Sequence, residues 1–205
     1  NGSGKTTMLK TLVGLNLPTS GQLFMHGLDV SRFAVESRRF ISYLPQRAIF
    51  PEVLSAGEIL RFYCRLRNIP AEKAKEILDR VGFNGFTNKP VSEFSGGMLQ
   101  RLGLAIMVLA DSPILLLDEP TANLDLHGAK RFREFILGEK QRGKTIIFST
   151  HLLEEAGELA DRVGIFVGGR LVAQESVEGL KSTYRAARTV QDMYLYYVEH
   201  HETQA

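Results

Sequence analysis

Hydrophobic residues recur along the chain with two different periods, and stretches of each period alternate. A helical period covers Thr6–Val13, with Gly14 as its stop, and a longer apolar helix is predicted at Met98–Ala110. Continuous apolar runs at Ile114–Leu117 and Thr145–Phe148 are typical of strands buried on both faces. Two further short strands are predicted, at Gln22–Met25 and Phe40–Leu44. This alternation of strands and helices predicts an α/β domain.

The helical period prevails from about residue 50 to about residue 93. Two sets of apolar positions there follow the i, i+3, i+4, i+7 spacing of amphipathic helices: Ile59, Phe62, Tyr63 and Leu66, then Ala74, Ile77, Leu78 and Val81. Pro70 precedes the second helix, and Gly82 follows it. We therefore expect a helical block inserted into the α/β body, with its aromatic residues in a core.

Near the C-terminus, Val163–Val167 and Arg170–Ala173 flank Gly168-Gly169, a sequence typical of a hairpin turn. The remaining residues are expected to be helical in part, with a polar end that frays. We predict a single domain, with an α/β core at residues 1–49 and 94–175. The helical subdomain is expected at about 50–93 and a C-terminal tail at about 176–205.

Composition narrows the classes of function. The 205 residues carry 25 basic and 23 acidic side chains, a net charge of +2, without a dense basic run, so no nucleic-acid partner is expected. Cys64 is the one cysteine, lies in an apolar helical stretch and is expected to pack in a core. No stretch reaches the ~18 consecutive apolar residues of a membrane span, and no signal peptide is visible.

The chain opens with Asn1-Gly2-Ser3-Gly4-Lys5-Thr6-Thr7, which has the form of a phosphate-binding loop lacking its first glycine. Glycines let backbone N–H groups turn toward phosphate oxygens, and the following helix directs its positive end to the same anion. Lys5 would supply a positive charge to the phosphates, and Thr6 a hydroxyl to Mg²⁺. The alternative is a flexible terminus followed by an unrelated helix.

A second candidate site follows the buried strand Ile114–Leu117. Asp118 stands at the carboxyl end of that strand, where ligands bind in α/β sheets, and it is suited to hold Mg²⁺ through water. Glu119 could act as the general base for an attacking water. A strand that ends in a polar turn at Pro120 is the alternative. Together with the Gly-Lys-Thr stretch, the two carboxylates predict an NTPase.

A third feature is Ser95-Gly96-Gly97, just before the apolar helix at Met98–Ala110. Ser95 is a favourable N-cap, and the two glycines would let a ligand approach the backbone closely. This predicts a second anion-binding helix terminus, unless the stretch is only a capped helix after a glycine turn.

These motifs, in this order, resemble the ATP-binding cassette (ABC) family, the nucleotide-binding subunits of ABC transporters. Ser95-Gly96-Gly97 resembles the family's signature motif, and Asn123-Leu124-Asp125 resembles its D-loop. Gln46, in Tyr43-Leu44-Pro45-Gln46, resembles the Q-loop glutamine, and His151 resembles the switch histidine. The resemblance spans residues 1–151 and extends to the Gly168-Gly169 hairpin. It implies a P-loop NTPase core with a mostly parallel sheet and an inserted helical subdomain.

The resemblance also implies ATP and Mg²⁺ as ligands and ATP hydrolysis as the activity. Glu119 and His151 would be catalytic, and Thr6, Gln46 and Asp118 would serve the metal. The remaining nucleotide contacts would come from the phosphate loop, Asn1 to Thr7, and from Gln46, Ser95, Gly96, Gly97 and Asp125. Family members pair head to tail, so that Ser95 and Gly97 would contact the γ-phosphate bound by the other subunit.

Partners and location follow from the same resemblance. We expect a second ATP-binding subunit, as a homodimer with a heterodimer left open, and a transmembrane permease subunit that docks on the helical block. The chain would then be cytoplasmic and peripheral, held on the inner face of the cell membrane through the permease. The family's antiparallel N-terminal subdomain, its adenine-stacking aromatic and the opening strand of its core sheet are missing from the 205 residues, which by themselves are expected to bind ATP poorly.

The signature departs from the usual Leu-Ser-Gly-Gly-Gln, because Phe94 replaces the leucine and Met98 the glutamine. A Gly-Gly-Met signature, with a tail such as Thr189–Tyr194, resembles an export-type or membrane-protein-maturation subgroup. Two alternatives remain. One is an ABC ATPase without a membrane partner, although only one cassette and no sustained heptads are present. The other is a non-hydrolysing nucleotide sensor, which the presence of Glu119 and His151 disfavours.

Overall fold

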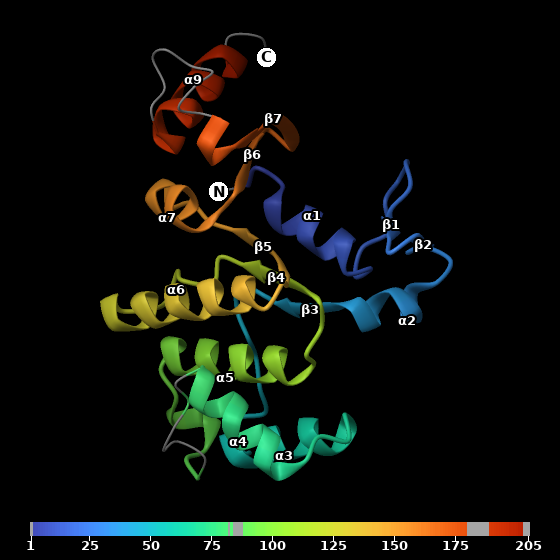
Figure 1. The fold of residues 1–205 in the computed structure, drawn as a ribbon, viewed down its shortest axis with the longest axis vertical. Coiled ribbons are helices and arrows are strands. Elements are labelled where there is room, and N and C mark those ends of the chain that lie inside the picture. The colour runs from blue at the N-terminus through green and yellow to red at the C-terminus, as the bar shows by residue number, and fades with distance from the viewer. Residues whose placement is uncertain (1, 82, 84–87, 180–188, 203–205) are drawn as a thin grey trace. The chain divides into compact units, whose positions relative to one another are not determined.

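The computed structural model describes residues 2–81, 83, 88–179 and 189–202 (Figure 1). Within these ranges helices and strands alternate, and the α/β fold class is confirmed. Their order is α1 (Lys5–Leu12), β1 (Phe24–Met25), β2 (Leu28–Asp29), α2 (Ala34–Ser37), β3 (Ile41–Leu44), α3 (Ala56–Leu66), α4 (Ala71–Arg80), α5 (Gly96–Leu109), β4 (Ile114–Asp118), α6 (Leu126–Gln141), β5 (Thr145–Ser149), α7 (Leu153–Leu159), β6 (Arg162–Val167), β7 (Arg170–Ser176) and α9 (Val190–Glu202). Two 3-10 helices, Arg38–Phe40 and Val91–Glu93, complete the set.

The chain forms two compact units. The first unit comprises residues 1–10 and 149–205, and the second comprises residues 11–148. Asn1 and Gly82, both named in the sequence-based predictions, lie outside the described residues, as does the polar end of the tail.

A three-stranded sheet with the order β3-β4-β5 organises the second unit. β3 and β4 are parallel, with Ile41 opposite Ile114 and Leu44 opposite Leu117. The leucines of β4 are at most 1% exposed, as predicted for a strand with both faces covered. The same prediction is wrong for β5, in which Ile147 is 37% exposed. The reason is position, since β5 ends the described sheet and β4 is flanked by a strand on each side.

Helix α5 packs against β3 at very short range. A methyl group added at Gly103 would come within 2.6 Å of Leu44 Cδ1, so only glycine allows this approach without a shift. Leu102 and Ala105, on the same helix, are fully buried. α3 and α4 lie on α5 in turn, so α5 connects the sheet to the helical block.

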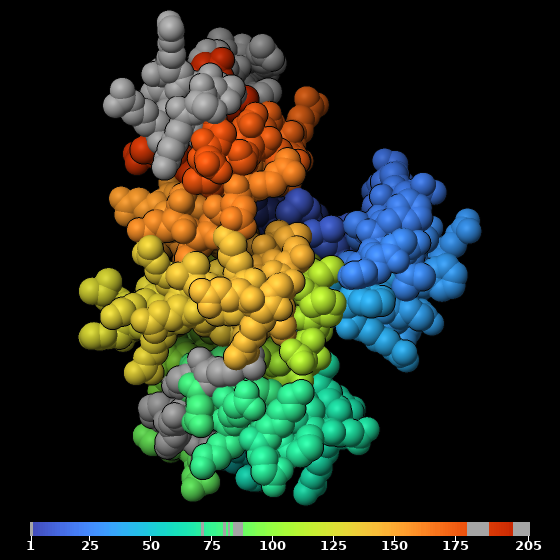
Figure 2. Space-filling view, in the orientation of Figure 1, coloured from blue at the N-terminus to red at the C-terminus, as the bar shows by residue number. Residues whose placement is uncertain are grey.

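The predicted helical block is present, with α3 and α4 as its main elements (blue-green in Figure 2). Ser55 and Glu58 form a reciprocal capping box at the start of α3, with Ser55 N donating to Glu58 Oε2 at 2.8 Å. The buried stripe of α3 runs through Ile59, Leu60 and Cys64. The expected core position of Phe62 is wrong, because this side chain is 59% exposed.

Helix α6 and the 3-10 helix before β3 were not predicted. α6 buries Phe132, Phe135 and Ile136, which follow helical spacing, but two glycines within the helix and many charged residues weaken the pattern. Near its end Glu139 is almost fully buried between two cations. Arg142 Nη1 lies 3.0 Å from Glu139 Oε1, and Lys144 Nζ lies 3.2 Å from Glu139 Oε2.

The predicted strand at Gln22–Met25 is shorter in the structure and belongs to a small hairpin. β1 pairs antiparallel with β2, with Met25 opposite Leu28. His26 and Gly27 form the turn, with φ angles of 47° and 79°. These left-handed values match the turn type that joins strands most tightly.

In the first unit, β6 and β7 form the predicted antiparallel hairpin. Gly168 and Gly169 turn the chain with φ angles of 54° and 82°, which glycine adopts without strain. Val190 and Met193 of α9 pack against Val163 and Ile165 of β6. The predicted helical character of the tail is thereby confirmed for residues 190–202.

Candidate functional site

The phosphate-loop sequence adopts a tightly curled path at the start of the first unit. Gly2 and Gly4 have φ angles of 80° and 98°, values that residues other than glycine rarely adopt. The helix α1 begins at Lys5, with Met8 N donating to Gly4 O at 2.9 Å. Lys5 Nζ donates to Ser3 Oγ at 2.9 Å, which brings the cation back over the loop. Thr6 follows in the first turn of α1.

The β6–β7 turn supports this loop. Gly169 N donates to Ser3 O at 3.1 Å, and a methyl group added at Gly4 would lie 3.3 Å from Gly169 Cα. Sequence reasoning assigned Gly169 only to a hairpin turn. The sequence does not indicate that Gly169 contacts Ser3, because the two residues are far apart along the chain. The glycines only permit the close approach.

His151 also belongs to the first unit. It follows the end of β5 and is exposed, in a turn where Leu152 N donates to Thr150 Oγ1 at 3.0 Å. This turn positions a side chain of the type predicted to contact a γ-phosphate. Its relation to the phosphate remains a prediction.

Two carboxylates stand at the carboxyl end of β4 in the second unit. Asp118 is 1% exposed, and Glu119 follows it with a φ angle of 44°. A left-handed φ at a glutamate is uncommon and indicates local strain, which often occurs at functional positions. Gln46, from the segment after β3, donates through Nε2 to Glu119 Oε2 at 3.0 Å. The structure therefore brings two of the predicted site residues into direct contact.

Tyr43, on β3, lies close enough to Asp118 to be affected by its charge and was missed as a site residue. Its pKa is raised to about 12, first because the ring is partly buried and second because the negative charge of Asp118 disfavours the phenolate. The signal was present in the sequence. A tyrosine within a buried strand, three residues before Gln46, needs a partner for its hydroxyl.

The signature-like segment and the D-loop-like segment touch within one chain. Ser95 is the N-cap of α5, as predicted, and its Oγ accepts from Met98 N at 3.3 Å. A methyl group added at Gly97 would lie 3.1 Å from Asn123 O. Asp125 caps α6 through Gly128 N at 2.6 Å, so this carboxylate has a structural role beside the predicted coupling role.

The side chains predicted to bind the metal carry the kinds of oxygen atom that Mg²⁺ prefers. Carboxylate, amide and hydroxyl oxygens are available from Asp118, Gln46 and Thr6, and hard divalent cations prefer such ligands. Across the described residues no group of three or more His, Cys, Asp or Glu side chains is placed to hold a metal. Mg²⁺ does not need such a cage, because phosphate oxygens and water complete its coordination when one or two carboxylates hold it.

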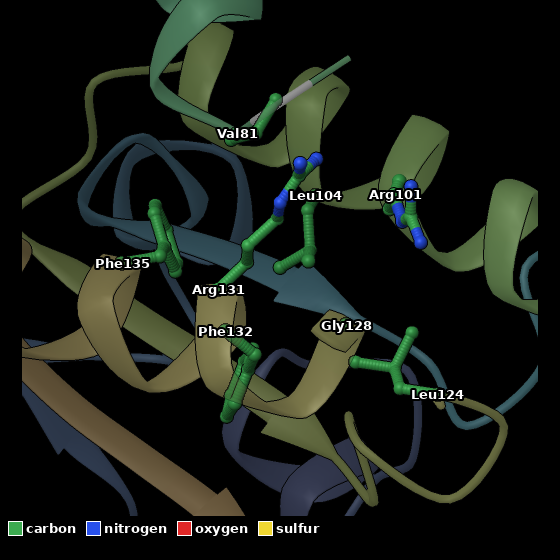
Figure 3. A pocket seen from close by; sticks show the side chains of 8 residues that line it. All are labelled: Val81, Arg101, Leu104, Leu124, Gly128, Arg131, Phe132 and Phe135. Atoms are coloured by element: carbon green, nitrogen blue, oxygen red, sulfur yellow. The ribbon is translucent and has the colours of Figure 1, made fainter. Parts of the chain in front are cut away.

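A separate, shallow pocket lies between α5 and α6 (Figure 3). Arg101 and Arg131 contribute cations to a mainly apolar lining that includes Leu104, Leu124, Phe132 and Phe135. None of the residues that line it is a predicted phosphate or metal contact. The pocket is therefore not the candidate nucleotide site.

The predicted site residues divide between the two units. Lys5, Thr6 and His151 lie in the first unit, whereas Gln46, Asp118 and Glu119 lie in the second with the Ser95–Gly97 and Asp125 segments. Within the described part of the chain, no helix combines the length and apolar character that crossing a bilayer requires.

Several known proteins of one family are similar to this chain in sequence. A family model described as "ABC transporter" matches residues 1–122. The chain is 38% identical over 183 residues to an uncharacterized ABC transporter ATP-binding protein, YcbN, of Bacillus subtilis (strain 168), covering 88% of the chain and 60% of the relative. It is 35% identical over 186 residues to the daunorubicin resistance ATP-binding protein DrrA3 of Streptomyces coeruleorubidus, covering 89% and 59%. The chain thus spans about three fifths of the length of these curated relatives.

A solved structure provides a third comparison. The dimeric, post-hydrolysis state of the ATP-binding cassette MJ0796, bound to ADP and Pi, superposes with a TM-score of 0.76 and 25% identity. The alignment covers 85% of this chain and 81% of that one. Both the α/β architecture and the parallel sheet are therefore shared with a nucleotide-bound cassette.

Proposed function

Because the chain belongs to the ABC transporter family, as its ATP-binding domain, we propose that it binds ATP with Mg²⁺ and hydrolyses the ATP to power a transporter. The observation that carries the proposal is the Gln46–Glu119 hydrogen bond of 3.0 Å beside the buried Asp118. It unites the Q-loop and the proposed general base at the carboxyl edge of a parallel sheet, where α/β proteins bind ligands. The ADP and Pi in the related cassette support the same chemistry.

Each residue has a defined part in the proposed reaction. The curled loop from Gly2 to Lys5 would hold the phosphates, and Asp118, Gln46 and Thr6 would hold the cation. Bound Mg²⁺ supplies charge neutralisation at the phosphates. Glu119 accepts a proton from the attacking water as the water oxygen forms a bond to the γ-phosphorus. The bond from that phosphorus to the β–γ bridging oxygen breaks, so ADP and inorganic phosphate leave.

The Gln46–Glu119 contact gives Gln46 a second role. While its Nε2 holds Glu119, the orientation of the base depends on the segment that leads into the helical block. A movement of that block would then change both the metal contact and the base. Coupling of this kind is how a γ-phosphate contact at a loop becomes a change elsewhere in a protein.

The test is to replace Glu119 in the full-length protein. Glu119→Gln keeps the size and the Gln46 contact but cannot accept the proton, so turnover should fall by roughly 10²- to 10⁴-fold while ATP stays bound. Glu134→Gln, at an exposed position of α6, is the matched control and should hydrolyse ATP at the wild-type rate. Equal rates for wild type and Glu119→Gln would remove Glu119 from the role of base. Absence of turnover in the wild type would favour the non-hydrolysing sensor.

We further propose that the transporter is of the export or membrane-protein-maturation type, and that a permease holds the chain at the inner face of the cell membrane. Met98 in the signature and the similarity to a drug-resistance ATP-binding protein support this type. Exposed apolar side chains at Ile49, Val53, Phe62 and Leu66 support docking near the helical block. Co-purification of the full-length protein with a multi-span membrane protein tests it. Co-purification with ribosomes or DNA instead would favour an ABC ATPase without a membrane partner.

A further inference from the structure

Tyr43 of β3 carries a buried hydroxyl group near Asp118 of the candidate site. Its Oη is buried and has no hydrogen-bond partner among the described residues. A buried hydroxyl that forms no hydrogen bond costs free energy, so such a group in a native fold calls for an explanation. The neighbouring serine shows the contrast. Ser42 Oγ, on the same strand, donates to Ser112 Oγ at 3.0 Å.

The strand register directs Tyr43 toward Asp118. Tyr43 of β3 is opposite Leu116 of β4, and residues paired across parallel strands project from the same face. Asp118 is two residues beyond Leu116, so it projects from that face as well. With strands about 4.8 Å apart and a rise of about 3.3 Å per residue, the two Cα atoms are roughly 8 Å apart. A tyrosine side chain that leans along the strand covers most of that distance.

Asp118 and Tyr43 have complementary chemistry at this position. The carboxylate is 1% exposed, so it depends on groups inside the protein or on a bound cation for its interactions. A phenol hydroxyl donates well to a carboxylate or to a water that a carboxylate holds. Groups that stand behind a metal ligand commonly orient that ligand and raise the affinity for the metal.

We propose that Tyr43 is a positioning residue for Asp118. When Mg²⁺ and nucleotide are bound, its hydroxyl donates to the Asp118 carboxylate, directly or through one water, and fixes the carboxylate in its metal-binding orientation. This inference rests on the proposed function, since it assigns Asp118 to the cation. It adds a residue from β3, so that β3 and the segment after it hold both carboxylates, Asp118 through Tyr43 and Glu119 through Gln46.

The experiment measures ATP binding by the full-length protein as Mg²⁺ is titrated, and again in excess EDTA. Tyr43→Phe should raise the half-saturating Mg²⁺ concentration about tenfold, the usual lower limit for losing a group behind a metal ligand. Its affinity for ATP in EDTA should equal that of the wild type. Its melting temperature without ligands should be equal or higher, because the variant removes a buried hydroxyl that has no partner in the described structure.

Ser42→Ala is the matched control on the same strand. It removes a buried hydroxyl that has a partner, so the melting temperature should fall while the Mg²⁺ titration stays at the wild-type position. An unchanged Mg²⁺ titration for Tyr43→Phe would overturn the inference. So would an equal loss of ATP affinity with and without Mg²⁺, since that pattern indicates a general effect on the sheet. A wild-type protein whose ATP binding ignores Mg²⁺ would overturn the proposed metal site itself, and the role of Tyr43 with it.

Discussion

Cys64 is the one cysteine of the chain, and its side chain is only 9% exposed on the buried stripe of α3. Burial raises the pKa of its thiol, because the thiolate would lose solvation there. A raised pKa means that less thiolate is present at any given pH, and the thiolate is the reactive form. The residue therefore has the properties of a packed core side chain, as its apolar surroundings in the sequence predicted.

The prediction is that Cys64 reacts slowly with thiol reagents in the folded protein. At mildly alkaline pH, the rate of modification should be at least about tenfold lower than in denaturant, where exposure and an ordinary pKa return. The 205 residues contain no second thiol, so modification within them reports on Cys64 alone. Rapid, complete modification of the native protein would show that α3 opens readily.

Gly96 and Gly97 differ in how closely Asn123 approaches them. A methyl group at Gly96 would lie 3.6 Å from Asn123 Cβ, an ordinary contact, whereas one at Gly97 would lie 3.1 Å from Asn123 O. Gly97→Ala should therefore destabilise the protein by about 1–3 kcal/mol relative to Gly96→Ala, through overpacking against backbone. Urea unfolding of the two variants compares them at neighbouring positions of the same helix. Equal midpoints would show that the Asn123 segment moves away freely.

For individual residues, the sequence predicted which residues belong to the candidate site better than it predicted which residues touch. Gln46, Asp118 and Glu119 were recognised from motifs, and their proximity follows because parallel strands end at the same edge of a sheet. Gly169 and Tyr43 were missed for a physical reason. Gly169 contacts Ser3 through its backbone, which leaves no pattern in the local sequence. A tyrosine in a buried strand does stand out, but its neighbour depends on the register of β3 and β4, which the local sequence does not encode.

Among the elements, those with strong periodicity or clear end signals were predicted and the others were not. α5 and β4 are uniformly apolar, and the β6–β7 hairpin has its Gly-Gly turn. α6 is set by tertiary packing of three apolar side chains and by the Asp125 cap, and no helix was predicted for this stretch. β5 was assigned correctly as a strand, but its exposure depends on its place in the sheet, which composition does not encode.

The contact between α5 and β3 permits a prediction at this scale. Gly103→Ala would place a methyl group 2.6 Å from Leu44 Cδ1 and 3.3 Å from Ala48 Cβ, so α5 or Leu44 must shift. The free energy of unfolding should fall by about 1–3 kcal/mol. Leu44 ends the strand that leads to Gln46, so a displaced strand should also weaken the Gln46–Glu119 contact.

Gly138→Ala is the control for this change. Gly138 lies in the interior of α6, and a methyl group there would meet nothing within 4 Å. The higher helix propensity of alanine should then raise the free energy of unfolding by about 0.5–1 kcal/mol. A stabilised Gly103→Ala variant would mean that Leu44 simply changes rotamer.

For the whole molecule, the two units carry different halves of the proposed chemistry. The first unit holds the phosphate loop and His151, and the second holds the two carboxylates and the signature-like segment. The family resemblance adds a further requirement, that Ser95 and Gly97 act on nucleotide held by another copy. The order of motifs along one chain predicts such pairing only through the resemblance, because no local pattern encodes a second copy.

Mixing two defective variants of the full-length protein tests this pairing. Lys5→Ala disables the phosphate loop, and Ser95→Arg places a large side chain at the start of α5. Each pure variant should be nearly inactive. In a mixed pair with head-to-tail sites, one site receives both substitutions and the other receives neither. At equal concentrations half of the pairs are mixed, so roughly a quarter of the wild-type rate should return on mixing. If each site instead used Lys5 and Ser95 of the same copy, every site would carry one defect and mixing would restore nothing.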